Sequence, residues 1–168
     1  DCLLSRGLGD VYKRQAYVSE HATIGDFFAH RSGLPGTAGD DLEDLGFTRS
    51  DVIARLRLLP LDAFRTSYHY ANFSTTIGAE AVARAAGRPW DGLADDLLFK
   101  PLGMTATSYR FSDFMARENR AVLHGYQKGV FVPLGQRDAD QQAPAGGASS
   151  TVVDMAQWIK LLLADGQY

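Results

Sequence analysis

The sequence predicts a mostly helical fold with one β-hairpin. Apolar residues at helical spacing recur along the chain, and several of these stripes follow a threonine–aspartate capping pattern. A run of β-branched and aromatic residues flanks one Lys-Gly pair, which is typical of a hairpin. The 168 residues are 45% hydrophobic and 22% charged, and this length and composition suit one globular domain with a hydrophobic core.

Three helices are predicted to begin where a threonine is followed three residues later by an aspartate. The first covers 23–30 and stops at Ser32-Gly33, the second runs from Thr48 to Pro60, and the third starts at Thr151. The residues expected to face inward are Ile24, Phe27 and Phe28, then Ile53, Leu56 and Leu59, and finally Met155, Trp158, Ile159 and Leu162.

Two more helices are expected on either side of Gly87, a residue type that commonly ends a helix. Pro89 is expected at the first position of the later helix, and Pro101 closes it. The residues expected to face inward are Phe73, Ile77, Ala81 and Ala85 on the earlier helix, and Trp90, Leu93, Leu97 and Leu98 on the later one.

The remaining segments are expected to form the hairpin and two loops. Residues 121–134 should pair as two strands around Lys128-Gly129. Residues 143–150 are expected to form a loop of small residues. The acidic stretch from Asp40 to Asp44 is expected to be a solvated loop, because its spacing and glycine position do not fit a calcium-binding EF-hand.

Residues 1–15, DCLLSRGLGDVYKRQ, show neither helical nor strand periodicity. They are expected to be an adapter-derived or disordered leader, and residues 16–168 are expected to form a partial domain. The single cysteine, Cys2, lies in this leader, so no internal disulfide is expected.

Charge and motif content argue against several functions. The net charge of −3 gives no support for nucleic-acid binding, and no apolar run is long enough to predict a transmembrane helix. The histidines lack metal-ligand spacing, and no G-x-S-x-G nucleophile elbow occurs. His30 and Ser32 are not expected to form a catalytic dyad, because residues two apart on a helix point away from each other. No metal or other cofactor is therefore expected.

Tyr70-Ala71-Asn72 is a Y-x-N tripeptide. It resembles the second active-site motif of the β-lactamase-related serine hydrolases, which include class C β-lactamases and penicillin-binding proteins. Three flanking blocks agree in order: residues 30–35 resemble the family's H-T-S-G-L-P turn, residues 98–104 resemble I-F-x-P-L-G-M, and residues 144–156 resemble P-A-G-G-x-x-S-T-x-x-D-L-A. Y-x-N alone is a weak signal, whereas four blocks in order are specific.

The resemblance implies a mostly α fragment, a helical lobe with one β-hairpin, of an α/β β-lactamase/transpeptidase-like fold. It implies acyl-enzyme chemistry in which Tyr70 is catalytic and shares the proton transfer, while Asn72 binds the substrate amide. Gly146 and Gly147 are candidates for the rim of the site. The residues by themselves also allow a packed tyrosine at a helix entrance, an N-cap role for Asn72 and a plain turn at the two glycines.

The family's nucleophile is the serine of an S-x-x-K motif, and this sequence contains no such motif. No serine stands three residues before any of its lysines, which are Lys13, Lys100, Lys128 and Lys160. The third motif of the family, K-T-G or H-x-G on a strand, has no match of the form K-[ST]-G or H-[ST]-G either. The chain alone is therefore expected to be inactive, with the nucleophile supplied by a longer parent protein.

The resemblance implies a small-molecule or peptidoglycan-like substrate, namely a β-lactam, a D-alanyl peptide or a carboxylic ester. It also favours a periplasmic or secreted location. Two alternatives stay open on the sequence: a relative that has lost catalysis and binds cell-wall peptides, and an unrelated helical interaction domain.

Overall fold

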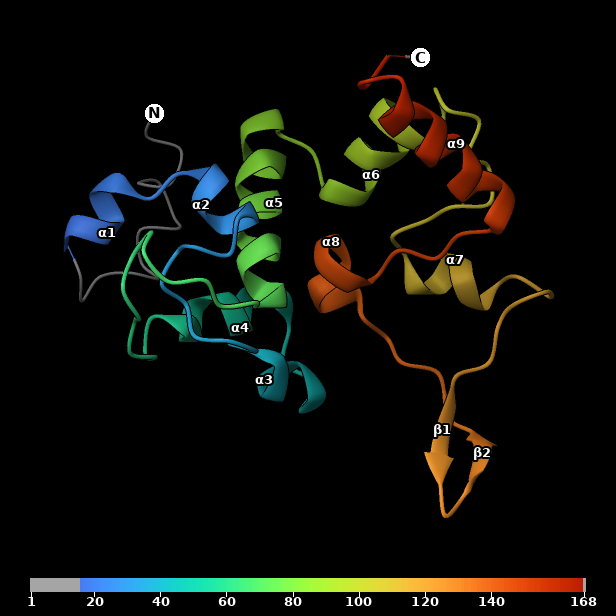
Figure 1. Cartoon of the computed structure of the whole chain (residues 1–168), viewed down its shortest axis with the longest axis horizontal. Helices are drawn as coiled ribbons and strands as arrows, with labels where there is room; N and C mark the ends of the chain where they lie inside the picture. The colour runs from blue at the N-terminus through green and yellow to red at the C-terminus, as the bar shows by residue number, and fades with distance from the viewer. Residues whose placement is uncertain (1–15, 168) are drawn as a thin grey trace.

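The computed structural model describes residues 16–167, in which the helices form two groups joined through α5 (Figure 1). The expected leader, residues 1–15, lies outside the described residues. The first group consists of α1 (Ala16–His21), α2 (Ile24–Phe28), α3 (Asp40–Asp44), α4 (Arg49–Leu56) and α5 (Asn72–Ala86). The second contains α6 (Trp90–Ala94), the π-helix η2 (Asp95–Phe99), α7 (Phe111–Met115), the 3-10 helix η3 (Asp140–Gln142), α8 (Ala143–Gly146) and α9 (Val152–Leu163).

The predicted hairpin is confirmed and projects away from the helices (Figure 1). Strands β1 (His124–Gln127) and β2 (Val130–Pro133) pair antiparallel, with Tyr126 opposite Phe131. The two turn residues, Lys128 and Gly129, have φ angles of 49° and 87°. Two consecutive positive φ angles are typical of the type I′ turn, whose twist matches that of a hairpin.

A hydrophobic core surrounds α5 in the first group. Fully or almost fully buried apolar side chains in it are Phe27, Leu34, Val52, Leu56, Phe73 and Ile77. The inward faces predicted for α4 and α5 are therefore confirmed, except that Ala85, in the last turn of α5, is exposed. Phe28 differs from the prediction, since 42% of it is exposed. The short α2 turns only Phe27 fully inward, and Phe28 lies over Gly78, where an added Cβ would be 3.2 Å from its ring.

The three threonine caps form as predicted. Thr23 and Asp26 make a reciprocal capping box at α2, in which the Thr23 N–H donates to the Asp26 carboxylate at 2.8 Å. Thr48 caps α4 and Thr151 caps α9, each accepting the N–H of the aspartate three residues later. Gly87 ends α5 in the left-handed conformation, with a φ of 64°.

The helix after Gly87 departs from the prediction at two places. Pro89 is the N-cap of α6 rather than its first helical residue. Further along, the π-turn of η2 (Asp95–Phe99) changes the directions of the side chains within it relative to a regular α-helix. As a result Leu97, expected to face inward, is 65% exposed, while Phe99 is buried with Met104.

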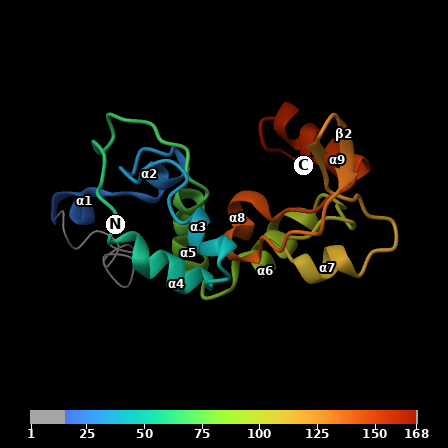
Figure 2. The same cartoon turned by 90° about the horizontal axis from the view of Figure 1, so that it is seen from below.

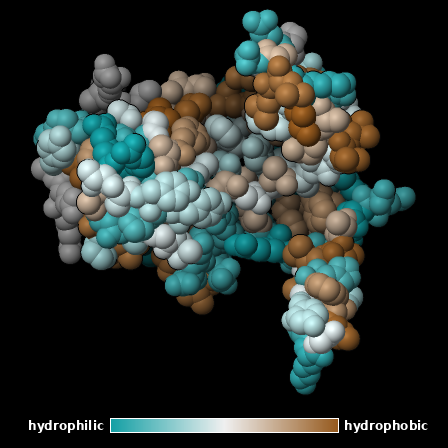
Figure 3. Space-filling view, viewed as in Figure 1, coloured by the Kyte–Doolittle hydropathy of each residue, from teal (hydrophilic) through white to brown (hydrophobic). Residues whose placement is uncertain are grey.

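The apolar stripe of α9 is only partly covered. Leu161 is buried, and Trp158 packs against the cluster around Phe99. Met155, Ile159 and Leu162, which the stripe predicted to be inward, are 41%, 52% and 57% exposed. Figure 3 shows the resulting apolar surface over α9.

Two expected loops contain short helices instead. Residues 40–44 form α3, and Glu43 is buried rather than solvated, with 6% of it exposed. Its carboxylate accepts a hydrogen bond from Arg137 at 2.9 Å and another from Gln142. Residues 143–146 form α8, with Pro144 in its first turn. Backbone N–H groups in the first turn have no acceptor within the helix, so the missing N–H of proline costs no hydrogen bond there. Both helices depend on partners far away in the sequence.

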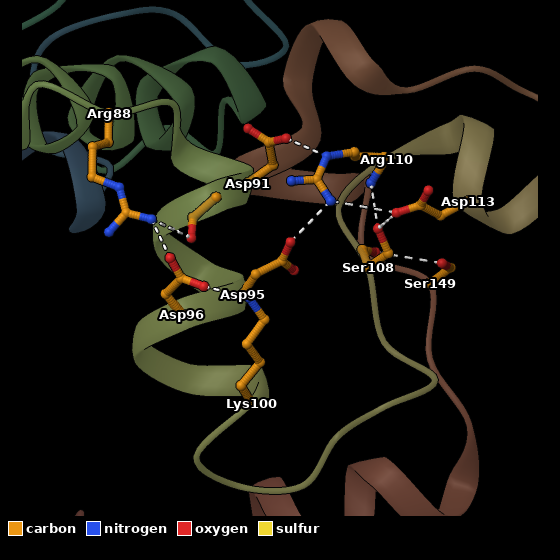
Figure 4. A network of polar contacts seen from close by, with 10 residues as sticks. Arg88, Asp91, Asp95, Asp96, Lys100, Ser108, Arg110, Asp113 and Ser149 are labelled. Carbon is orange, nitrogen blue, oxygen red and sulfur yellow. Dashed lines mark hydrogen bonds and ion pairs between the residues drawn. The ribbon is translucent and has the colours of Figure 1, made fainter.

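Arg110 joins three elements of the second group (Figure 4). Its guanidinium pairs with Asp91 on α6, with Asp95 of η2 at 2.9 Å and with Asp113 on α7 at 3.4 Å. The hydrogen bonds to Asp95 and Asp91 raise the pKa of Arg110, so this side chain remains charged. Figure 4 shows that one side chain thereby fixes the relative positions of α6, η2 and α7.

Within residues 16–167, no helix is both long and apolar enough to cross a bilayer. The same residues contain no group of three or more histidine, cysteine, aspartate or glutamate side chains placed to hold a metal ion.

Candidate functional site

Tyr70 lies on the extended segment that leads into α5, and 56% of it is exposed. Backbone hydrogen bonds hold this segment against the turn at residues 30–37. Thr37 N–H donates to the Tyr70 carbonyl at 3.0 Å, and His69 N–H donates to the His30 carbonyl at 3.1 Å. The backbone of Tyr70 is therefore fixed while its ring remains accessible.

His30 supports the tripeptide with its side chain as well. Its ring centre lies 4.7 Å from that of Tyr70, and its Nδ1 accepts the Ala71 N–H at 3.4 Å. Burial lowers the pKa of His30, so its ring is neutral at pH 7 and Nδ1 is free to accept. His30 also has a positive φ of 55°, a conformation that a non-glycine residue adopts at a cost. The first residue of the HRSGLP block thus positions Tyr70.

Ser32 does not form a dyad with His30, in agreement with the sequence analysis. It is 1% exposed, and its hydroxyl lies 3.4 Å from that of Ser74, which donates to the Phe27 carbonyl at 2.8 Å. The next residue, Gly33, has a φ of 88°, and an added Cβ would lie 2.9 Å from the Asp62 carbonyl oxygen. The turn therefore requires glycine here, and its role is to shape the support beneath Tyr70.

Asn72 is the first residue of α5, and the N-cap position belongs to Ala71, which offers no side-chain cap. The N-cap alternative for Asn72 is therefore wrong, because the tripeptide backbone enters the helix one residue earlier. The Asn72 side chain interacts with Asp40 instead. Burial raises the pKa of the Asp40 carboxyl, and the Asn72 amide partly offsets that rise. Among the described residues, Asp40 Oδ1 is buried without a hydrogen-bond partner.

Gly146 and Gly147 lie at the end of α8, which packs against α5 and α6. Gly146 faces open space, whereas an added Cβ on Gly147 would lie 2.6 Å from the Ala143 Cα. Gly147 thus permits a close backbone approach. Among the described residues, no hydrogen bond joins either glycine to Tyr70 or Asn72.

The block around these glycines is held to the segment before α7. Ser108 and Ser149 form an isolated antiparallel bridge, in which Ser108 N–H donates to the Ser149 carbonyl at 3.0 Å. Asp154 is buried, and its carboxylate accepts the Ala106 N–H at 2.7 Å. The P-A-G-G block is therefore rigidly placed beside α5 by contacts that its own sequence does not reveal.

Sequence reasoning missed the roles of two residues in this site. His30 was identified only as the first letter of a motif block, and Asp40 only as part of an acidic loop. Both residues lie 30 or more positions before the tripeptide, and nothing in the sequence indicates that they approach it. The chemistry available here is that of an accessible phenol next to an amide, both fixed at the entrance of a helix.

Comparison with known proteins places the chain in a family. The family model described as Beta-lactamase matches residues 8–168. This chain belongs to the beta-lactamase family. It is therefore a relative of serine hydrolases, and the alternative of an unrelated helical interaction domain is excluded. The mostly helical fold with one two-stranded sheet corresponds to part of the β-lactamase/transpeptidase fold.

Three similar proteins illustrate the relationship. Unguisins hydrolase ungD of Aspergillus violaceofuscus is 28% identical over 84% of this chain and 27% of its own length. The D-alanyl-D-alanine-carboxypeptidase/endopeptidase AmpH of Escherichia coli is 28% identical over 59% of this chain and 24% of its own. A crystal structure of a class C beta-lactamase superposes with a TM-score of 0.72 at 17% identity, over 98% of this chain and 43% of that one. The chain thus spans about a quarter of the length of these two curated relatives.

Proposed function

We propose that this chain is the part of a serine hydrolase that supplies the Y-x-N motif for acyl-enzyme chemistry on an amide or ester. In this proposal Tyr70 exchanges protons with the nucleophile and leaving group, and Asn72 binds the substrate amide. The observation that carries it is Tyr70 itself, whose backbone is fixed by the turn at residues 30–37 while its ring is accessible.

The nucleophile is proposed to come from a longer protein. This sequence has no S-x-x-K motif, and the chain spans only 27% of the unguisins hydrolase it matches. On its own, the 168-residue chain is expected to hydrolyse neither a chromogenic β-lactam nor a p-nitrophenyl ester.

The substrate proposal follows the family. A D-alanyl peptide, a β-lactam and a carboxylic ester all present a carbonyl that a serine can acylate. The AmpH relative, named as a D-alanyl-D-alanine-carboxypeptidase/endopeptidase, favours testing the peptide first. A periplasmic or secreted location is proposed with it, because cell-wall peptides are found there.

The test is a Tyr70→Phe variant of a longer protein that contains this chain. Turnover should fall by about 10²–10⁴-fold with little change in substrate binding, because a proton-transfer group acts mainly in the transition state. Tyr68→Phe is the matched control, since Tyr68 lies two residues earlier and is 64% exposed. Equal activity in the two variants would contradict the role of Tyr70. No turnover of any substrate, together with binding of a cell-wall peptide, would instead favour a relative that has lost catalysis.

A further inference from the structure

A second site lies between α4 and α5, away from the Y-x-N motif. The two helices lie side by side (Figure 2), and a pocket of about 580 Å³ opens between them and η3. Such a volume is within the range of small-molecule sites. Its α5 residues, Glu80 and Arg84, follow Asn72 by two turns or more, or roughly 12–18 Å along the helix. The pocket is therefore distinct from the candidate active site.

The pocket carries two guanidinium groups that have no partner in the part of the chain that the structure describes. Arg57 and Arg84 line it and are exposed, and within residues 16–167 neither guanidinium forms a hydrogen bond or ion pair. Arg49, which also lines it, is already engaged. Its guanidinium donates to the backbone carbonyls of Asp140 at 2.6 Å and Gln141 at 3.0 Å. Arg57 and Arg84 are therefore the groups available to an anion.

The same pocket contains one unused acceptor. Glu80 Oε1 lies 4.0 Å from Arg49, but within the described residues Glu80 Oε2 is buried and has no hydrogen-bond partner. The negative charge of Glu80 is therefore only partly compensated by Arg49, and a ligand cation at the exposed part of the carboxylate would compensate it further. The pocket thus offers an acceptor for a cation beside two donors for an anion.

We propose that this pocket binds a small zwitterion, an amino acid or short peptide. Its carboxylate is bound by Arg57 and Arg84, and its ammonium group pairs with the Glu80 carboxylate, whose side chain is 22% exposed. Both charges of the ligand are needed, because a simple anion would lie near the negative charge of Glu80 without compensating it. The site is independent of the proposed hydrolase activity, since neither Tyr70 nor Asn72 takes part.

Three probes separate the two halves of the ligand, each titrated into the chain by NMR or calorimetry. Glycylglycine carries both charges, N-acetylglycine only the carboxylate, and glycinamide only the ammonium. Glycylglycine should bind about tenfold more tightly than either single-charge probe, as expected for an added charged hydrogen bond. Inorganic phosphate is the fourth arm, and tighter binding of phosphate than of glycylglycine would overturn the zwitterion proposal.

Two variants assign the two charges. Arg57→Gln with Arg84→Gln should abolish the advantage of glycylglycine over glycinamide, and Glu80→Gln should abolish its advantage over N-acetylglycine. Lys128→Gln, at the tip of the hairpin that projects away from the helices (Figure 1), removes a positive charge outside the pocket lining and should change neither. The arginine variants alter exposed side chains, so their fold, checked by circular dichroism, should be retained. Absence of saturable glycylglycine binding, or binding that these variants leave unchanged, would overturn the proposal.

Discussion

Asp26 links α2 to the segment that precedes Tyr70. Its carboxylate caps α2 through Thr23 and pairs with the Arg65 guanidinium at 2.9 Å. Burial by itself would raise the pKa of this carboxyl, but the hydrogen bonds from Arg65 and Thr23 outweigh it and lower the pKa to about 2. Because the chain passes from Arg65 to Tyr70 in five residues, this ion pair helps to place the motif.

The ion pair of Asp26 with Arg65 should make the free energy of unfolding fall as the pH is lowered into the acidic range. A carboxyl with a lowered pKa contributes stability that is fully present above its unfolded pKa of about 4 and is lost as the pH falls towards about 2. We expect a loss of about 1–2 kcal/mol from this group, reduced by the exposure of Arg65. Urea denaturation of the chain at pH values from 5 to 2 measures it.

Asp26→Asn should remove that part of the pH dependence and lower stability at pH 7. Glu118→Gln is the control, because Glu118 is exposed and should leave the pH profile unchanged. An Asp26→Asn chain with the same loss between pH 4 and pH 2 as the unaltered chain would contradict the assignment.

The backbone geometry at the end of α8 requires a glycine at position 147, because there is no room for a Cβ atom there. Gly147 approaches the Ala143 backbone so closely that an added Cβ would lie 2.6 Å from Cα and 2.9 Å from Cβ. Backbone atoms of a helix cannot move aside as the end of a flexible side chain can. The close approach therefore sets how α8 leads into the bridge at Ser149.

Gly147→Ala should consequently destabilise the chain by about 1–3 kcal/mol, the usual cost of overpacking. Gly146→Ala is a closely matched control, because Gly146 is a helical residue that faces open space, where alanine should be neutral or slightly stabilising. Thermal or urea unfolding of both variants provides the comparison. Equal stabilities would show that α8 relaxes to accept the methyl group.

At the scale of the whole molecule, the two groups of helices differ in how completely they are covered. The first group has a closed core around α5, whereas α9 presents a wide apolar surface (Figure 3). Leu161 and Leu163 lie two residues apart on this helix, yet Leu161 is 9% exposed and Leu163 is 82% exposed. They report separately on the covered and uncovered faces of α9.

Leu161→Ala should cost about 2 kcal/mol or more, while Leu163→Ala should stay within about 0.5 kcal/mol in this chain. Urea unfolding of the two variants measures the difference. In a longer protein that contains the chain, a rise in the cost of Leu163→Ala would show that a further segment packs on this face. A large cost of Leu163→Ala in the chain itself would contradict the exposed position of that side chain.

Interactions within a few residues could be predicted from the sequence alone. The caps at Thr23, Thr48 and Thr151 and the turn at Lys128-Gly129 form as expected, because the partners of each lie within the same helix end or hairpin. The motif blocks likewise indicated the family whose model matches residues 8–168.

Only the tertiary structure decided what lies next to Tyr70 and which side chains are buried. His30 reaches the motif from 40 residues earlier, and Glu43 is buried because Arg137 and Gln142, more than 90 residues later, satisfy its carboxylate. Regular helical spacing predicts that Leu97 faces inward, but the π-turn changes the direction of this side chain and exposes it. Contacts between distant segments leave no periodic pattern in the sequence. The spacing of residues therefore predicts the helices and strands, whereas the packing of distant segments decides which side chains surround the site.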